Sequence, residues 1–128
     1  MTEARQNLGR LGEELVAREL TAKGWEIVAR NTRVKGIRGE LDIVAINAGE
    51  LVIVEVKTGR EGARSGPESM LEMVGPRKQA KLRRLAGAWA TANRGTIPRA
   101  RGLRIDVIGL RVDWNGQVTE WRHVRGAC

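Results

Sequence analysis

The sequence has few cysteine, histidine and aromatic residues, which cross-link or fill the cores of many small proteins. It contains four Trp but no Phe and no Tyr, so Leu, Ile, Val and Ala must supply most of the interior. Cys128 is the single cysteine and His123 the single histidine, which excludes an internal disulfide and a Cys/His zinc cluster. We expect Cys128 to be a frayed terminal thiol without consequence. A chain of 128 residues can still fold without staples, so we predict one domain over residues 1–128.

Long apolar runs are absent as well. No segment approaches the roughly 20 apolar residues that a membrane span needs, and the N-terminal segment lacks an apolar stretch of signal-peptide type. We therefore expect a cytoplasmic protein without a membrane partner. The formal net charge of +8 indicates attraction to a polyanion, usually nucleic acid. A generally basic, Arg-rich composition would give the same charge. The charge therefore makes DNA a predicted partner but does not distinguish a DNA-binding protein from one with a merely basic surface.

The residue patterns predict an α/β fold in the order helix, three strands, helix, two strands. Apolar residues recur along one face of a helix over residues 6–23, and Pro76 begins a second helix that ends near residue 93. The predicted strands cover residues 25–29, 40–46, 51–57, 103–112 and 117–124. The second and third strands form an antiparallel hairpin, and the fourth, reached through a helix, runs parallel to the third. The result is a mixed β-sheet with flanking helices.

The third predicted strand ends in charged residues that an apolar strand seldom carries. Side chains alternate along a strand, so Glu55 and Lys57 share one face at the end of a run that is apolar on both faces. Asp42 lies within the preceding strand, and the hairpin turn makes paired positions sum to about 97, so Asp42 faces Glu55. Two carboxylates on facing positions of neighbouring strands repel each other, and a divalent cation between them removes this repulsion. Oxygen ligands favour Mg²⁺ or Mn²⁺, and Lys57 beside them can polarise a phosphate or activate water. The alternative is a salt bridge that closes the strand end.

Basic residues flank this predicted site. They lie in the polar segments 30–33 and 35–39, in the loop after residue 57, and on the second helix, and they comprise Arg33, Lys35, Arg38, Arg60, Arg77, Lys78 and Lys81. Such residues suit phosphate contacts, which carry most nucleic-acid affinity, although a charged helix face is more often simply solvated. Gln79 or Lys78 is a further candidate to approach the metal. A short helical turn is predicted over residues 69–73.

Four further features favour structural roles. Arg104 and Asp106 share a strand face and are predicted to form an ion pair, and His123 is expected to be structural. The four Trp residues are dispersed and are interpreted as packing residues, not as a platform for bases. Gly12 lies inside the first helix at a cost of about 1 kcal/mol relative to Ala, which predicts a close approach to the sheet.

Asp42 followed after thirteen positions by Glu55-Val56-Lys57 resembles the PD-(D/E)XK nuclease signature, with Leu41 where that signature has Pro. The whole chain resembles the YraN-like family of small bacterial proteins over roughly residues 8–110. The matching stretches are Gly9–Glu14 with Ala17 and Leu20, Arg30-Asn31, Gly39–Asp42, Val54–Lys57, Arg77–Gln79 and Arg104–Val107.

This resemblance implies a restriction-endonuclease-like fold related to archaeal Holliday junction resolvases. It also implies that Glu13 on the first helix reaches the metal site, and that the protein acts as a homodimer. Taken together, the sequence predicts a metal-dependent endonuclease that hydrolyses DNA phosphodiester bonds, with Asp42, Glu55, Lys57 and Glu13 as its site. A non-catalytic nucleic-acid-binding protein on the same fold, or an interaction module for an acidic protein, remains an alternative.

Overall fold

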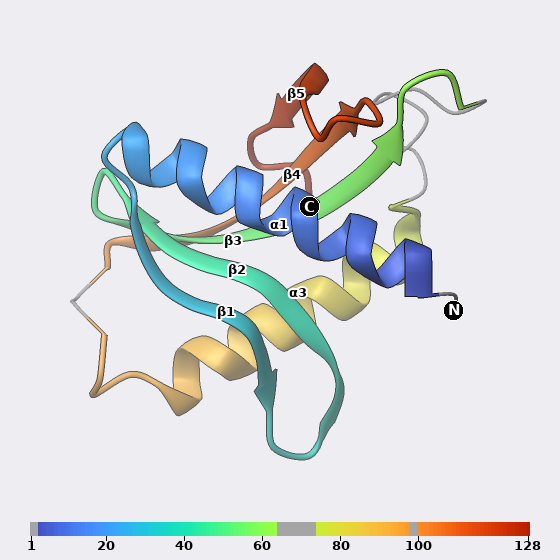
Figure 1. The fold of residues 1–128 in the computed structure, drawn as a ribbon. Coiled ribbons are helices and arrows are strands. Elements are labelled where there is room, and N and C mark those ends of the chain that lie inside the picture. The colour runs from blue at the N-terminus through green and yellow to red at the C-terminus, as the bar shows by residue number, and fades with distance from the viewer. Residues whose placement is uncertain (1–2, 64–73, 98–99) are drawn as a thin grey trace.

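A computed structural model describes residues 3–63, 74–97 and 100–128, and within them it has a five-stranded sheet with one helix on each face (Figure 1). The elements are α1 (Glu3–Ala22), β1 (Glu26–Val34), β2 (Ile37–Asn47), β3 (Glu50–Arg60), α3 (Pro76–Ala92), β4 (Gly102–Val112) and β5 (Val118–Val124). The helical turn predicted at 69–73 lies outside the described residues. Both helices were predicted from their apolar periodicity, and each begins and ends within three residues of its expected bounds.

The strands lie in the spatial order β1-β2-β3-β4-β5, with β3 at the centre. Neighbouring strands pair antiparallel except β3 and β4, which run parallel from Glu50↔Gly102 to Arg60↔Val112. The parallel pair is joined through α3, as a crossover connection requires. This is the mixed α/β architecture, with the element order, that the sequence predicted.

The sheet has an apolar core on each face. On one face α1 contributes Val16, Ala17 and Leu20, which pack with inward residues of β2, β3 and β4. On the other face α3 contributes its buried residues, which are Leu82, Leu85, Ala86 and Trp89. Because β3 is covered on both sides, its residues from Leu51 to Val56 are all buried, as its continuous apolar run predicted. No helix within the described ranges has the length and apolar character that crossing a membrane requires.

Strands β1 and β2 are longer than the predicted strands 25–29 and 40–46, and they pair as an antiparallel hairpin that was not predicted. The polar segment 30–33 belongs to β1 and most of segment 35–39 belongs to β2, so the connecting turn shrinks to Lys35 and Gly36. Pairing shifts between Ile27 and Ala29 and again between Thr32 and Val34. These bulges break the two-residue periodicity by which strands are found in a sequence. An edge hairpin also tolerates polar residues, because one side of it meets water.

At Gly12, α1 approaches the sheet closely. A Cβ built on Gly12 would lie 1.7 Å from Thr58 Oγ1 and 2.8 Å from Thr58 Cβ on β3. Gly9, three positions earlier on α1, has nothing within 4 Å of its own built Cβ. The close approach predicted from the cost of a helical glycine is therefore confirmed. The missing side chain of Gly12 leaves space for Thr58.

We expect Gly12→Ala to lower the free energy of unfolding by about 1–3 kcal/mol, because the new methyl group overlaps Thr58 and forces α1 off the sheet. Gly9→Ala is the matched control and should raise it by about 0.5–1 kcal/mol, since Ala is the better helix former. Urea unfolding of the three proteins measures both effects. Equal stabilisation by the two substitutions would contradict the close contact.

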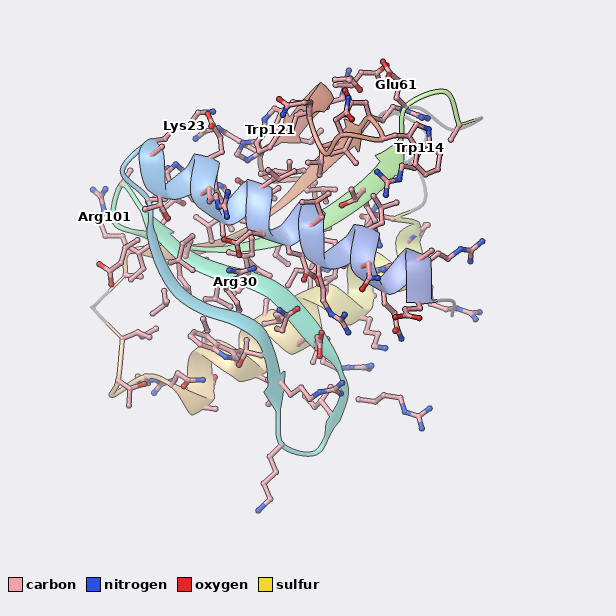
Figure 2. All side chains as sticks on the ribbon, in the orientation of Figure 1. Lys23, Arg30, Glu61, Arg101, Trp114 and Trp121 are labelled. Carbon is pink, nitrogen blue, oxygen red and sulfur yellow. The ribbon has the colours of Figure 1, made fainter. Side chains whose placement is uncertain are left out.

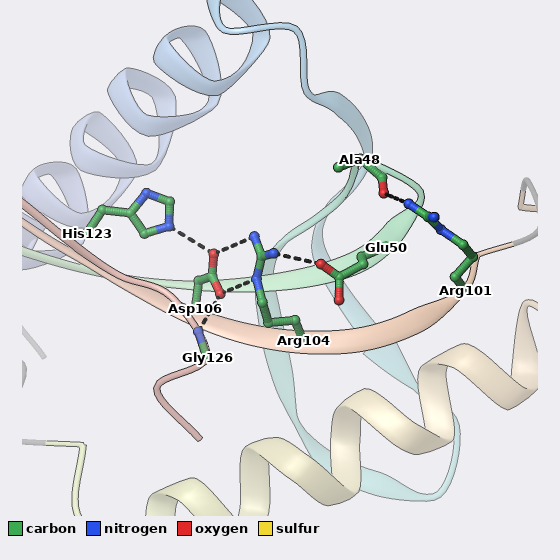
Figure 3. A network of polar contacts seen from close by, with 7 residues as sticks. All are labelled: Ala48, Glu50, Arg101, Arg104, Asp106, His123 and Gly126. Atoms are coloured by element: carbon green, nitrogen blue, oxygen red, sulfur yellow. Dashed lines mark hydrogen bonds and ion pairs between the residues drawn. The ribbon is translucent and has the colours of Figure 1, made fainter.

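A buried carboxylate ties the last two strands to the chain end (Figure 3). Asp106 is fully buried and accepts hydrogen bonds from Arg104 Nε at 2.8 Å and from the Gly126 backbone N–H at 2.9 Å. His123 Nε2 lies 2.8 Å from its other oxygen. The predicted Arg104–Asp106 ion pair is thus confirmed, and His123 is a structural partner that the sequence did not pair. Burial opposes ionisation of Asp106, but the hydrogen bonds from His123, Arg104 and Gly126 outweigh it and lower its pKa to about 2.

The lowered pKa of Asp106 predicts a specific acid sensitivity. A carboxylate whose pKa falls on folding contributes stability above its unfolded pKa and loses it as the pH drops through the folded value. We expect about 2 kcal/mol of stability to disappear between pH 4 and pH 2 through this group. Asp106→Asn should be less stable at pH 7 and should show a shallower loss over that range. Unfolding curves measured from pH 2 to pH 7 test this, and parallel curves for the two proteins would contradict it.

Candidate metal and nucleic-acid site

The candidate site lies where β2 and β3 separate. Their pairing runs from Asn47↔Glu50 to Ile43↔Val54, whose numbers sum to 97 as predicted. Beyond that pair β2 bends away toward the hairpin with β1 (Figure 1). At the fork the Asp42 side chain replaces a backbone partner, because its Oδ2 accepts the Val56 N–H at 2.9 Å. This bond fixes the Asp42 carboxylate between the two strands.

Three carboxyl groups form a hydrogen-bonded chain through this fork. Glu13 on α1 hydrogen bonds with Asp42, and Asp42 hydrogen bonds with Glu55 on β3. The Glu55 side chain is only 7% exposed. The structure therefore brings together the three acidic residues that the sequence and its family resemblance assigned to the site.

Crowding and burial shift the titration of all three carboxyl groups in the same direction. Burial raises the pKa of Glu13 and of Asp42 although hydrogen bonds partly oppose it. Burial, the hydrogen bond to Asp42 and the Asp42 charge raise the pKa of Glu55 to about 8. The protonated Glu55 carboxyl then donates to Asp42. The cluster thus keeps a carboxyl group protonated, whereas a bound cation would allow all of its carboxyl groups to ionise.

Two lysines complete the cluster. Lys78 on α3 places its Nζ 3.6 Å from Glu55 Oε2 and hydrogen bonds with Lys57. Burial and the neighbouring Lys78 lower the pKa of Lys57. Burial opposes the charge on Lys78, but its hydrogen bond to Lys57 and the attraction of Glu55 and Asp42 outweigh burial and raise its pKa. Lys57 is thus the more readily deprotonated amine of the pair, which suits it to accept a proton.

The donor set fits a hard divalent cation. Mg²⁺ is commonly held by one or two carboxylates, with waters and substrate phosphates completing its shell, and Asp42 and Glu55 supply that pair. No group of three or more His, Cys, Asp or Glu side chains within residues 3–63, 74–97 and 100–128 has the arrangement of a metal site. Glu13 as a third ligand therefore stays a prediction, and its observed contact is with Asp42.

The predicted nucleic-acid-binding residues fall into three places. Arg77, Lys78 and Lys81 line an open groove of about 830 Å³ on the first turns of α3, together with Arg84. Arg33, Lys35 and Arg38 lie on the hairpin of β1 and β2, where Arg33 is paired with Glu40 at 3.2 Å. Arg60 ends β3 on the other side of the fork (Figure 1). The basic groups thus flank the fork on several elements and do not form one patch.

Some residues of the site were missed from the sequence. Asn31, which has a left-handed backbone with φ of 48°, lies close enough to Glu13 to lower the pKa of that carboxyl group. Its position in the matched pair Arg30-Asn31 was the available signal. Of the two candidates on α3, Lys78 reaches the cluster, whereas Gln79 donates instead to the Val74 carbonyl at 2.9 Å.

Cys128 is not the frayed thiol that the sequence predicted. It packs partly buried against the core under α3, and burial raises its pKa.

Fold and site together define a small α/β protein with an acidic and lysine cluster at a fork in its central sheet. The model of Uncharacterised protein family UPF0102 matches residues 12–110, and the chain belongs to this family, which is the YraN-like family that its motifs indicated. The chain is 52% identical to a UPF0102 protein of Acidothermus cellulolyticus, over 97% of this chain and 95% of that one. It is 44% identical to a UPF0102 protein of Streptomyces coelicolor, over 98% and 91% of the two chains.

Solved structures show more distant likenesses. A fdxN element excision controlling factor protein from Anabaena variabilis has a TM-score of 0.46 at 19% identity, over 88% of this chain and 98% of that one. Pyrococcus furiosus SfsA in complex with Ca²⁺ has a TM-score of 0.38 at 16% identity, over 94% and 63% of the two chains. Similarity at this level does not indicate a shared chemistry.

The raised pKa of Glu55 predicts how stability depends on pH. The unfolded chain loses this proton near pH 4.5 and the folded chain near pH 8, so the native protein loses stability as the pH rises between these values. We expect Glu55→Gln to abolish that loss, and to gain on the order of 3 kcal/mol over the native protein between pH 5 and pH 8. Urea unfolding at a series of pH values measures the difference. A constant difference across the series would show that Glu55 ionises normally.

Proposed function

We propose that the protein is an endonuclease that depends on Mg²⁺ or Mn²⁺ and hydrolyses phosphodiester bonds of DNA, with branched or structured DNA as its substrate. The observation that carries this proposal is the pair of hydrogen-bonded carboxyl groups, Asp42 and Glu55, beside a lysine of lowered pKa. An ion pair that merely closed a strand would not need a second carboxyl group, since repulsion between carboxylates destabilises the fold. The preference for branched DNA rests on the family resemblance alone.

Each residue has a role that follows from its position. Asp42 and Glu55 would hold the cation, which supplies charge stabilisation to the phosphate and acidifies a bound water. Lys57 orients the attacking water and accepts its proton, which its lowered pKa favours. Glu13 orients Asp42 through their hydrogen bond. Lys78, whose pKa is raised, stays charged and attracts the phosphate.

The surroundings of the cluster suit a DNA backbone. The groove on α3 with Arg77, Lys78 and Lys81 opens beside the Glu55 carboxyl group, to which Lys78 is paired. The exposed side of the β1–β2 hairpin adds Lys35 and Arg38. Phosphate contacts of this kind would make binding strongly salt-dependent. A homodimer and a cytoplasmic location remain predictions. The homodimer is predicted because paired cuts at a junction require two sites.

A non-catalytic DNA-binding protein is the second candidate, because the basic groove would serve binding alone. The lowered pKa of Lys57 favours catalysis over this alternative, since a lysine used only for phosphate contact has no need of it. The interaction module for an acidic protein has no specific observation in its favour.

We expect Asp42→Asn and Lys57→Ala to reduce Mg²⁺-dependent cleavage by about 10²-fold or more, because the first weakens a ligand of the cation and the second removes the group that accepts the proton of the attacking water. The assay compares linear, flap and four-way junction DNA with Mg²⁺, Mn²⁺ or EDTA.

Adjacent glutamates on α1 give a matched control for this assay. Glu13→Gln should reduce cleavage, because Glu13 bonds to Asp42. Glu14→Gln should not, because Glu14 pairs instead with Arg18 and Arg30. Equal residual cutting by Asp42→Asn, Lys57→Ala and the native protein would refute the assignment of the site. DNA binding without any cutting would favour the non-catalytic candidate.

A further inference from the structure

The two edge strands of the sheet differ in their fitness to pair with a further strand. The strand order places β1 at one edge and β5 at the other (Figure 1). The pairing of β1 with β2 shifts twice, and such bulges turn an edge strand away from further pairing. In contrast, β5 pairs with β4 without a shift from Glu120 to Val124. Every second residue of β5 directs its backbone N–H and C=O away from β4, where no other strand in the described part of the chain pairs with them.

The charge along β5 is balanced, unlike the charge of the whole chain. The formal net charge is +8, so two copies repel each other on average. The strand carries one acidic and one basic side chain, Glu120 and Arg122, and both residues are exposed. Glu120 keeps 53% of its side chain exposed although it pairs with Arg111 at 3.7 Å. At this edge a second copy therefore meets a neutral segment with one charge of each sign.

Glu120 and Arg122 point to the same face of the sheet, and Trp121 between them points to the other. Trp121 packs partly buried against the core under α1, and Lys23 Nζ lies 5.9 Å from its ring centroid (Figure 2). Side chains alternate along a strand, so Glu120 and Arg122 share the face of Val124, which pairs with Val107 of the core under α3. The two charged groups thus stand two residues apart on one side of an exposed edge.

Symmetry and charge together restrict how two copies of β5 can pair. Facing side chains of an antiparallel pair lie on one face, so a two-fold symmetric pairing is centred on a residue that faces its own copy. Centring on Glu120 or on Arg122 sets like charges opposite each other, which is destabilising. Centring on Trp121 sets each Glu120 opposite Arg122 of the second copy and the two indole rings opposite each other, and both kinds of pair are favourable.

We propose that β5 is a homodimer interface, in which it pairs antiparallel with β5 of a second copy around a two-fold axis at Trp121. The two five-stranded sheets then form one continuous sheet of ten strands. The interface is defined by backbone pairing along the edge and by the two Glu120–Arg122 pairs, and it does not depend on the proposed catalysis.

The pairing also involves apolar side chains that are exposed in a single copy. Val118 at the start of β5 is 41% exposed. Trp114, on the turn before β5, is 81% exposed, contrary to the packing role that the sequence predicted for it. Antiparallel pairing places the start of each β5 beside the end of the other. Val118 then falls within the paired segment, near Val124 of the second copy, and Trp114 lies next to that segment.

The dimer would place two candidate sites on one side of the sheet, a consequence that rests on the proposed function. A two-fold axis that relates two antiparallel edge strands is perpendicular to the sheet, so the faces covered by α3 point the same way in both copies. Glu55 and Lys57 lie on β3, and β3 is five strand spacings, or about 24 Å, from β3 of the second copy across the sheet. Two sites on a common side suit two cuts in one DNA molecule.

The register predicts which cysteines can join two copies. Glu120→Cys and Arg122→Cys are made in separate proteins, each of which also carries Cys128→Ser. Opposite residues have Cα atoms about 4.5–5.5 Å apart, which a disulfide can span, whereas diagonal neighbours are about 7–8 Å apart. Oxidation of a mixture should therefore give the mixed disulfide between positions 120 and 122 in excess over random pairing. Mass spectrometry of the cross-linked species measures the proportions.

Charge reversal tests the same pairs without a new thiol. Glu120→Arg sets two arginines opposite each other and should weaken the dimer by about tenfold or more. Adding Arg122→Glu exchanges the two partners and should restore most of the affinity. Glu26→Arg makes the same charge change on β1 at the other edge and, as the matched control, should leave the dimer unchanged. Sedimentation equilibrium measures the dissociation constants, and circular dichroism checks that each variant is folded.

The outcomes separate this interface from the proposed function. A native protein that stays monomeric at every concentration measured overturns the interface. A dimer that folded Glu120→Arg leaves intact, or an excess of the 120–120 or the 122–122 disulfide, also overturns it, since each indicates another surface or another register. A monomer that cuts DNA with Mg²⁺ refutes only the interface, and a dimer that cuts no DNA refutes only the proposed function. Loss with Glu120→Arg, recovery in the exchanged protein and an excess of the mixed disulfide support the interface.

Discussion

The structure depends at its centre on a carboxylate placed where a backbone group would normally lie. Asp42 takes the N–H of Val56 at the point where β2 leaves β3, and so opens the sheet without leaving that donor unpaired. The same carboxylate meets Glu13 from one helix and Glu55 from the central strand. Holding acidic groups this close is unfavourable unless protons or a cation offset their repulsion. This repulsion between carboxyl groups distinguishes the fork from an ordinary strand end.

The two helices supply different parts of the site because they cover opposite faces of the sheet. On one side α1 approaches β3 closely through Gly12, and this closeness brings the neighbouring Glu13 to Asp42. On the other side, α3 begins at Pro76 and directs Lys78 to Glu55 and Lys57. Asp106, Arg104 and His123 form a separate ionic network that fixes β4, β5 and the chain end (Figure 3). The reactive cluster and the structural ion pairs are thus distinct.

Much of the fold could be predicted because its signals are local. The apolar run of β3 indicated a strand buried on both faces, and the turn before Glu50 set a register that paired Ile43 with Val54. The two strands of the polar edge hairpin were predicted too short and their pairing was not predicted, since bulges and exposed residues remove the alternation that marks a strand. Trp114 was interpreted as a packing residue because its sequence does not reveal that its turn projects into solvent.

The sequence by itself determined the strand and helix order, the register of β2 with β3, the need for a glycine at position 12 and the membership of the YraN-like family. Only the tertiary structure decided that Asn31 supports Glu13, that Lys78 rather than Gln79 joins the cluster, and that His123 bonds to Asp106. The reason is physical. Periodicity and turn chemistry act between residues close in the chain, whereas these contacts join distant segments whose meeting depends on how the helices pack on the sheet.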